Sequence, residues 1–355
     1  MDSIKYIGRE VHKDAIVIAV LKDNGKLVME SIIETKASTI LQLIQGLRGE
    51  LYLSFEEGTW AAWLYDLRKP QVTKVVVCNP RKNALLQAGS KSDKLDARKL
   101  AELLRGGHLR PVYHGENGLC TLKELARSYR TISQDLTRVM NRLKALDRSW
   151  AIPGAGTSVY SPRQRAGGLN KIREAGVRRR AEFFYQELDG LRTLPRAVRR
   201  DRLQQSRKPC ATKLLGEIPS SGPLRAARTI ALIQTPHRFR TKRQRWTYSG
   251  LGIETHDRAE YGYVEGPLPR CQKPVQIRGL NRNHNRDLKN LFQGTAIGAS
   301  GNPRPFQDFY AGLLGKGMKP EMARLTLARK IAAITLRVWK RGERFDVKHL
   351  KPQTA

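Results

Sequence analysis

The first 80 residues combine strand patterns with helix patterns, and their order constrains the fold most. Three short runs rich in β-branched residues come first, separated by turn signals such as Asp23-Asn24-Gly25: KYIGREV, AIVIAVLKD and KLVMESIIETK. A helix pattern with Ser38 as N-cap, the strand LYLSFEE, the helix TWAAWLYDLRK and the strand TKVVVCNP follow. Strands followed by alternating helices and strands predict an α/β sheet of mixed strand direction.

Two long helical patterns dominate the middle of the chain. They cover about residues 119–150 and 169–194, with a break between them over 151–168. Two long polar helices joined by a loop predict an antiparallel coiled-coil hairpin. The basic segment LPRAVRRDRLQQSRKP then either continues the second helix or serves as a linker.

A third part begins near residue 211. The segment TKLLGEIPSSGPLRAARTIALIQTPHRF predicts a helix, a tight turn and a second helix. Such a hairpin either offers backbone N–H groups to a phosphate or forms an ordinary corner between helices. Residues 252–290 have an irregular pattern, and EMARLTLARKIAAITLRVWKRG predicts a last amphipathic helix. We therefore expect three domains, at 1–112, 113–210 and 211–355.

The charge of the chain is extreme and uneven. The formal net charge is +34, with 66 Lys and Arg against 32 Asp and Glu. Residues 1–110 hold 18 basic and 13 acidic residues, whereas residues 161–210 alone hold 14 against 5. Such an excess predicts binding to a polyanion, most often nucleic acid. The carboxylates gather in the N-terminal part, and the cationic surface lies downstream.

A membrane or secreted location is not expected. The start MDSIKYIGREVHKD lacks the apolar region of a signal peptide, and no apolar run is long enough to span a bilayer. The four cysteines are far apart and form no CxxC pair, which argues against a zinc ribbon and a disulfide framework. We expect a reduced, cytoplasmic protein.

A pair of aspartates at the start of a basic helix is the first chemical signal. Asp93 and Asp96 precede a helix pattern that runs from about residue 96 to 105. Acids at a helix start often serve as caps or complement the helix dipole. Combined with Glu10 and an acid at the end of the fourth strand, they would instead hold two Mg²⁺ ions roughly 4 Å apart for phosphodiester cleavage.

Four segments in this order resemble the DEDD transposases of the bacterial insertion-sequence family "one-ten", which includes the pilin-gene invertases: YIGREVHKDAIVIAVL, SFEEGTWAAWLYDL, VVVCNP and KSDKLDARKLAELL. Further similarity extends through the C-terminal part, in IPSSGPLRAARTIALIQTPHRFRTKRQRWTYSGLGIE and IRGLNRNHNRDLKNLFQGTA. The resemblance implies a RuvC-like, ribonuclease-H-type N-terminal domain, a coiled coil and a C-terminal transposase domain with a helix-hairpin-helix element. It also implies Mg²⁺-dependent DNA recombination, guided in several members by a structured RNA.

The resemblance assigns the metal ligands to Glu10, Glu56, Asp93 and Asp96. Glu10 stands where the family has Asp, one methylene shorter, and rigid metal sites tolerate such changes poorly. Glu56 is favoured as the second acid because it follows an apolar strand residue, as the family's acid does, and Glu57 is the alternative.

The C-terminal nucleophile of the family has no clear counterpart. The resemblance implies a serine shortly after the Y-x-G-L element, but Ser249 comes too early and no other serine precedes Ser300. The region offers Tyr261 and Cys271, both of which could attack a phosphodiester in principle. A structural role for each is the preferred interpretation.

Several basic residues are candidates for contacts with nucleic acid. Arg and Asn side chains are suited to base edges and phosphates, and a basic run on a helix is suited to phosphates. The candidates are Lys13, Arg98, Arg178, Arg179, Arg180, Arg278, Arg282 and Arg286.

Three functions stay open at this point. The first is a Mg²⁺-dependent DNA transposase or recombinase that acts as a homo-oligomer in the bacterial cytoplasm, with a guide RNA as a further partner. The second is a decayed relic that binds nucleic acid without catalysis, which Glu10 and the missing serine motivate. The third is a RuvC-like nuclease without strand transfer.

Overall fold

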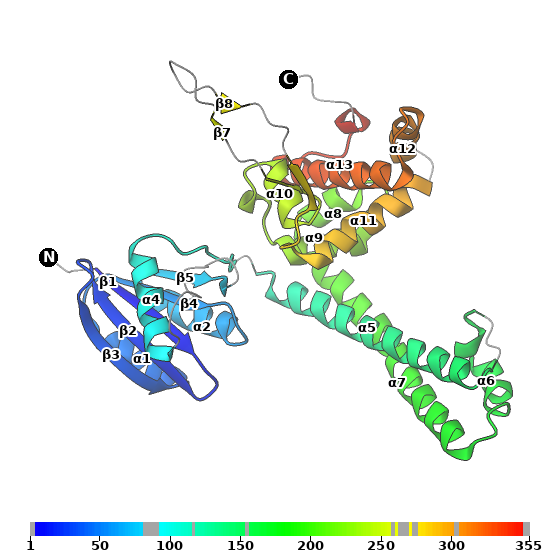
Figure 1. The fold of residues 1–355 in the computed structure, drawn as a ribbon, viewed down its shortest axis with the longest axis horizontal. Coiled ribbons are helices and arrows are strands. Elements are labelled where there is room, and N and C mark those ends of the chain that lie inside the picture. Colours follow the sequence, from blue (N-terminus) through cyan, green and yellow to red (C-terminus); the bar gives the residue numbers. More distant parts are fainter. Residues whose placement is uncertain are drawn as a thin grey trace. The chain divides into compact units, whose positions relative to one another are not determined.

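The computed structural model describes residues 4–80, 92–115, 118–152, 156–256, 260–261, 270–271, 276–301 and 305–350. The chain divides into two compact units, residues 1–116 and 117–355 (Figure 1), which we describe one at a time.

Unit 1 is built on one mixed β-sheet. Its strands follow the spatial order β3-β2-β1-β4-β5, in which β1, β2 and β3 pair antiparallel and β1, β4 and β5 pair parallel. The sheet confirms the predicted mixed α/β architecture. The five strands are β1 (Lys5–Val11), β2 (Ala15–Lys22), β3 (Leu27–Glu34), β4 (Leu51–Glu56) and β5 (Lys74–Cys78).

Helices cover both faces of this sheet. On one face, α1 (Ala37–Gln45) and α2 (Ala61–Arg68) bury a cluster around Ile7, Leu53 and Phe55, and the short turn η1 (Lys69–Gln71) follows α2. On the other face, α4 (Asp93–Arg105) packs on β1 and β2 through a second cluster. Because strand side chains alternate, neighbouring residues of β1 serve opposite faces.

Two helix starts differ from the sequence prediction. Helix α1 begins at Ala37 after Lys36, and no side chain caps it. The prediction of Ser38 as the N-cap is therefore wrong. Helix α4 begins at Asp93, earlier than predicted, because the Ser92 hydroxyl accepts a hydrogen bond from the Leu95 amide and caps the first turn.

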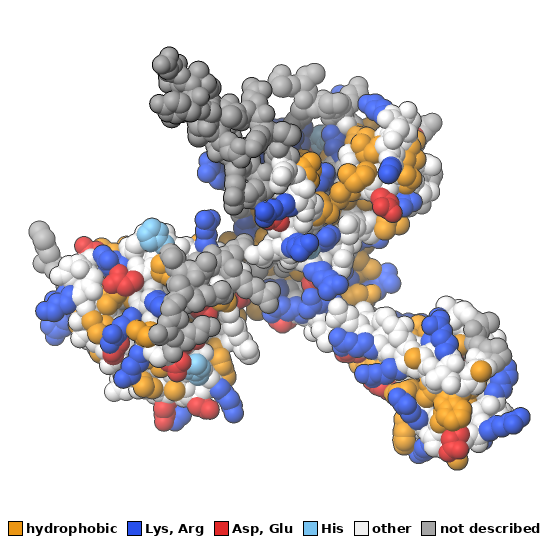
Figure 2. Space-filling view, in the orientation of Figure 1, with side chains coloured by type: hydrophobic (Ala, Val, Ile, Leu, Met, Phe, Trp, Pro, Cys, Tyr) orange, Lys and Arg blue, Asp and Glu red, His pale blue; other side chains and the backbone are white. Residues whose placement is uncertain are grey.

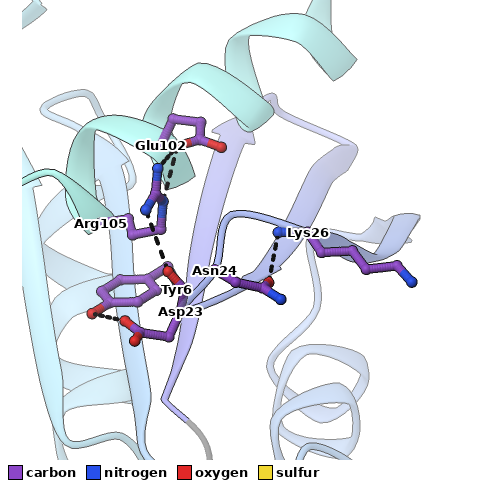
Figure 3. A network of polar contacts seen from close by, with 6 residues as sticks. All are labelled: Tyr6, Asp23, Asn24, Lys26, Glu102 and Arg105. Carbon is purple, nitrogen blue, oxygen red and sulfur yellow. Dashed lines mark hydrogen bonds and ion pairs between the residues drawn. The ribbon is translucent and has the colours of Figure 1, made fainter.

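The C-terminal end of α4 is tied to the turn between β2 and β3 (Figure 3). Arg105 donates to the carbonyl of Asp23 at 3.3 Å, and the Tyr6 hydroxyl donates to the Asp23 carboxylate at 3.3 Å. Arg105 also pairs with Glu102 one turn earlier at 2.9 Å. These bonds hold the C-terminal end of α4 in place and so help to set the position of its first turn.

Unit 2 opens with a long helical hairpin. Helices α5 (Cys120–Ser149) and α7 (Ala175–Ser206) lie side by side, connected through η3 (Ser158–Tyr160) and α6 (Pro162–Leu169) (Figure 1). Val139, Leu143 and Leu188 are buried between them. Helix α7 continues through the basic segment and contains Pro195, so that segment is no linker. A coiled-coil supercoil of the pair stays a prediction.

The remainder of unit 2 is mostly helical and shares one hydrophobic core, which includes Phe292, Leu327 and Ile331. Its helices are α8 (Ala211–Gly216), α9 (Gly222–Ile233), α10 (Lys242–Tyr248), α11 (Arg286–Gly301), α12 (Phe306–Gly315) and α13 (Pro320–Arg341), with the turns η4 (Pro236–Arg238) and η5 (Val347–Leu350). The last helix is confirmed. The expected helix-hairpin-helix element corresponds to α8 and α9, which pack together, but its assignment stays a prediction.

The region expected to be irregular contains regular structure. Strands β6 (Ile253–His256) and β9 (Gln276–Leu280) pair antiparallel, and so do the two-residue strands β7 (Glu260–Tyr261) and β8 (Arg270–Cys271). The side chains of Tyr261 and Cys271 lie outside what the structure describes.

Candidate active site

Glu10 and Glu56 come from neighbouring parallel strands. The register of β1 and β4 pairs Arg9 with Phe55, which places Glu10 and Glu56 one step further along at the same sheet edge. Since side chains alternate along a strand, Glu10 faces the side of Gly8, where α4 packs, and Arg9 is buried on the other side. The two acids are therefore adjacent at the carboxyl ends of their strands.

Gly8 lets α4 approach the sheet at backbone distance. A Cβ atom on Gly8 would lie 2.0 Å from the Ala97 carbonyl oxygen and 2.4 Å from the Ala101 amide nitrogen. Only glycine fits at this crossing. The contact sets the first turn of α4, with Asp93 and Asp96, next to the strand end that carries Glu10. Sequence reasoning did not identify this role, although a glycine two residues before the first acid is a visible signal.

The acids repel one another electrostatically. The pKa of Glu10 is raised from 4.5 to about 7, first by burial and then by the charge of Glu56, with partial compensation by His12 and weaker contributions from Asp96 and Asp93. Burial and then the charge of Asp96 also raise the pKa of Glu56. All four predicted carboxylates therefore share one electrostatic neighbourhood.

The two aspartates of α4 differ in their contacts. The Asp93 carboxylate pairs with His12 Nε2 at 3.2 Å, and 58% of its side chain is exposed. Asp96 is half-buried, and its Oδ1 atom has no hydrogen-bond partner, with Lys99 Nζ at 3.7 Å. Since Ser92 caps the helix, neither acid is needed as a cap. An unsatisfied buried carboxylate oxygen fits a cation that the acids would share.

Glu56 and Glu57 have different surroundings. The Glu57 carboxylate lies 2.9 Å from His114 Nε2, and the His114 ring stacks on Tyr65 with centroids 4.9 Å apart. Glu56 instead interacts with Asp96 and Glu10. A cavity of about 300 Å³ beside them is lined by Glu10, Glu56, Glu57 and Trp60, among others. These contacts favour Glu56 as the second acid of the site.

Within the described ranges, no three His, Cys, Asp or Glu side chains are arranged closely enough to form a metal site. The carboxylates are neighbours without a ready-made coordination shell. Their chemistry nevertheless fits Mg²⁺, which takes oxygen ligands and retains water molecules, so that protein oxygens need not complete the shell.

The predicted nucleic-acid contacts fall into two groups. Some already have partners: Arg98 donates to both carboxylate oxygens of Glu30, and Arg178 donates to the Ile172 carbonyl at 2.9 Å. Arg179 pairs with Glu182, and Arg180 lies over the Phe184 ring. The others have exposed side chains: Lys13, Arg278, Arg282 and Arg286. Figure 2 shows Lys and Arg side chains spread widely over unit 2.

Ser249 is fully buried at the end of α10, and its hydroxyl has no hydrogen-bond partner. A hydroxyl inside the core is not open to a DNA backbone. Its burial agrees with the sequence argument that Ser249 does not occupy the position of the family's serine.

A mixed sheet whose strand ends gather carboxylates with a helix start offers the oxygen ligands that metal-dependent phosphodiester chemistry requires. Residues 7–148 match the family described as transposase, of the DEDD type of insertion sequence IS110. This match assigns residues 7–148 to that family of transposases. The match extends through unit 1 and nearly all of α5. No curated protein matches the chain. Among the described residues, no helix is long and apolar enough to cross a membrane.

Proposed function

We propose that this protein cuts and rejoins DNA at an insertion element through a Mg²⁺ site formed by Glu10, Glu56, Asp93 and Asp96. The observation that carries the proposal is the meeting of acids from two adjacent strand ends and from the first turn of α4, where the Oδ1 atom of Asp96 accepts no hydrogen bond. Membership of the transposase family supplies the substrate class.

The residues of unit 1 would divide the work among them. Glu10 and Glu56 present oxygens from two adjacent strand ends, and Asp96 adds Oδ1 from α4. His12 holds the exposed carboxylate of Asp93 beside them. Bound Mg²⁺ would stabilise the attacking and leaving oxygens of a phosphodiester. Gly8 keeps the helix close enough for acids from both elements to meet.

Asp96→Asn tests this assignment, with Glu57→Gln as the matched control in the neighbouring ion pair. We expect Asp96→Asn to lower Mg²⁺-dependent strand cleavage by at least about 100-fold, as loss of an essential electrostatic group does, while DNA binding persists. Glu57→Gln should keep most of the activity. Full cleavage activity of the Asp96→Asn variant would show that Asp96 is not part of the site.

A binding-only protein is the second candidate. The observations that favour it are Glu10 in place of the shorter Asp and acids that do not form a ready-made coordination shell. An excision assay with the element's own flanking DNA separates the two, with the natural protein compared with Glu10→Asp. Excision by the natural protein supports the enzyme, and excision only by Glu10→Asp supports a decayed first ligand. No excision by either supports the binding-only protein.

A structured guide RNA and a homo-oligomeric assembly belong to the proposal on the strength of the family resemblance alone. Co-purification of RNA, identified by sequencing, tests the first. Light scattering of the protein with and without DNA tests the second. A nuclease without strand transfer would give cleaved but never rejoined DNA in the same reactions.

A further inference from the structure

A basic groove lies in unit 2, away from the residues discussed so far. It has a volume of about 740 Å³ and is formed by α10, α12, α13 and η5, together with Arg240, which lies two residues before α10. Eight Lys and Arg side chains line it, and the described lining contains no Asp or Glu. A concave surface of one charge sign concentrates the field and attracts polyanions.

Some of these cations are held by the protein, and others are available. Arg329 donates to the Leu251 carbonyl at 2.6 Å, and Arg337 pairs with Glu343 at 2.7 Å. The side chains of Arg240 and Lys348 are exposed and have no hydrogen bond or ion pair within the described part of the chain. Lys242 is also exposed and lies 6.0 Å above the Trp246 ring.

The cations are crowded. Burial lowers the pKa of Lys330, and the neighbouring charge of Lys242 lowers it further. Like charges held together without a lining acid cost the folded protein free energy, which a polyanionic ligand would offset.

The floor of the groove is apolar and aromatic. Trp246, Phe309 and Ile334 lie among the cations. The indole N–H of Trp246 donates to the Arg329 carbonyl at 2.9 Å, which fixes the plane of the ring. A site for a small inorganic anion would not need such a floor. Cations around a fixed aromatic ring match a nucleotide unit, with its phosphate and flat base.

We propose that this groove binds single-stranded nucleic acid, with phosphates at Arg240, Lys242 and Lys348 and a base against the floor. A duplex stacks its bases inside and would leave the apolar floor uncovered, so a single strand fits better. The inference deepens the proposed function, because strand exchange and guide pairing both produce unpaired strands, but binding here needs neither Mg²⁺ nor Glu10.

The test compares two double variants of the full-length protein in EDTA. Arg240→Ala with Lys242→Ala removes two groove cations whose side chains make no hydrogen bond within the described structure. Lys316→Ala with Arg324→Ala removes the same charge from exposed positions outside the groove. Fluorescence anisotropy measures binding of labelled 12-nucleotide oligo-dT and oligo-U and of a 12-base-pair duplex over a range of salt concentrations.

We expect the groove variant to bind both single strands about tenfold or more weakly. The slope of the logarithm of the binding constant against the logarithm of the salt concentration should become less steep by about 1.4, as expected for two lost phosphate contacts. The affinity of the control variant for single strands, and the affinity of the groove variant for the duplex, should each change by less than about threefold. Equal losses for single strand and duplex would overturn the proposal, and so would equal losses in the two variants. Displacement of the oligonucleotides by poly-glutamate at equal charge would also overturn it, because it would indicate an acidic-peptide site. Failure of DNA cleavage alone would leave this result untouched.

Discussion

Glu10 lies among three other carboxylates, and His12 offsets their repulsion only in part. In the absence of a divalent cation this arrangement costs stability, because a charge whose pKa is raised from 4.5 to about 7 is disfavoured in the folded state. A measurement of this cost in folding stability therefore tests the site without any assay of recombination.

Glu10→Gln should therefore stabilise the metal-free protein at pH 8, by about 1–2 kcal/mol after allowance for solvent screening. It should also lose most of the thermal stabilisation that Mg²⁺ gives the natural protein. Differential scanning calorimetry with EDTA and with Mg²⁺ measures both effects. Glu57→Gln serves as the control. If metal-free Glu10→Gln were less stable than the metal-free natural protein, repulsion among the carboxylates around Glu10 would be contradicted.

Arg245 is a second residue at which charge opposes folding. Its side chain is fully buried beside Phe239 and Phe292, and its guanidinium nitrogens have no hydrogen-bond partner. Burial lowers the pKa of Arg245 to about 9. A buried cation without a partner is often replaced by an apolar side chain at no loss of stability.

Arg245→Met should raise the free energy of unfolding at pH 7 by about 1–2 kcal/mol. A basic group with a depressed folded pKa destabilises the protein below that pKa, and the penalty shrinks as pH rises above about 9. The advantage of the variant should thus shrink above pH 9. Urea denaturation at pH 7 and pH 10 measures the difference, and an advantage that grows with pH would contradict this account.

At the scale of elements, the crossing of β1 and α4 holds the site together. Gly8 contacts the helix backbone, Arg105 and Tyr6 tie the far end of α4 at Asp23, and Ser92 caps its start. The four acids of the site depend on this crossing, although none of these residues belongs to the site.

Gly8→Ala should displace α4 because the new Cβ would overlap backbone atoms that cannot rotate away. We expect a loss of about 3 kcal/mol or more in stability, as for overpacked cores, together with loss of cleavage. Gly58→Ala is the matched control, since no atom lies within 4 Å of its added Cβ. Thermal melts followed by circular dichroism and cleavage assays compare the two variants. Equal melting temperatures would contradict the close contact between Gly8 and the backbone of α4.

The sequence patterns were sufficient for the strands of unit 1 and for the last helix, because alternation and helical spacing are local signals. They failed where tertiary contacts decide. For the segment around Pro195 they left a helix continuation and a linker both open, and α7 continues because Tyr185 and Leu188 pack before the proline and Arg202 lies over Tyr129 after it. The ladder of β6 and β9 was missed because both strands are short and lack a sustained alternation of apolar and polar residues.

The candidate site was predictable in part for the same reason. Asp93 and Asp96 stand out through their spacing, whereas the choice between Glu56 and Glu57 depends on which side chain turns toward α4 and which toward His114. The groove of unit 2 was missed because its cations come from segments as far apart as Arg240 and Lys348. Only the fold brings them to one surface.

At the scale of the whole molecule, the two units differ in both core and charge. Among the described residues, each hydrophobic cluster lies within a single unit. Residues 1–116 hold 18 Lys and Arg against 14 Asp and Glu, and residues 117–355 hold 48 against 18. Unit 1 thus has its own core and little net charge.

A fragment of residues 1–116 should fold alone and melt cooperatively, because its clusters do not depend on unit 2. Its affinity for DNA at moderate salt should be about 100-fold or more below that of the full chain, since few phosphate contacts are available to it. Calorimetry and anisotropy test the two statements. A fragment without a cooperative transition would contradict the first, and near-equal affinity the second.

Under the proposed function, the uneven charge also sets the order of events when the protein meets DNA. Long-range attraction acts on the strongly basic unit 2 and speeds the first encounter, whereas the nearly neutral unit 1 feels little pull. Unit 2 then serves as an anchor, and unit 1 samples the nearby backbone at the raised local concentration that a shared chain enforces. A cutting unit with little affinity of its own can release one phosphate and try the next without the molecule leaving the DNA.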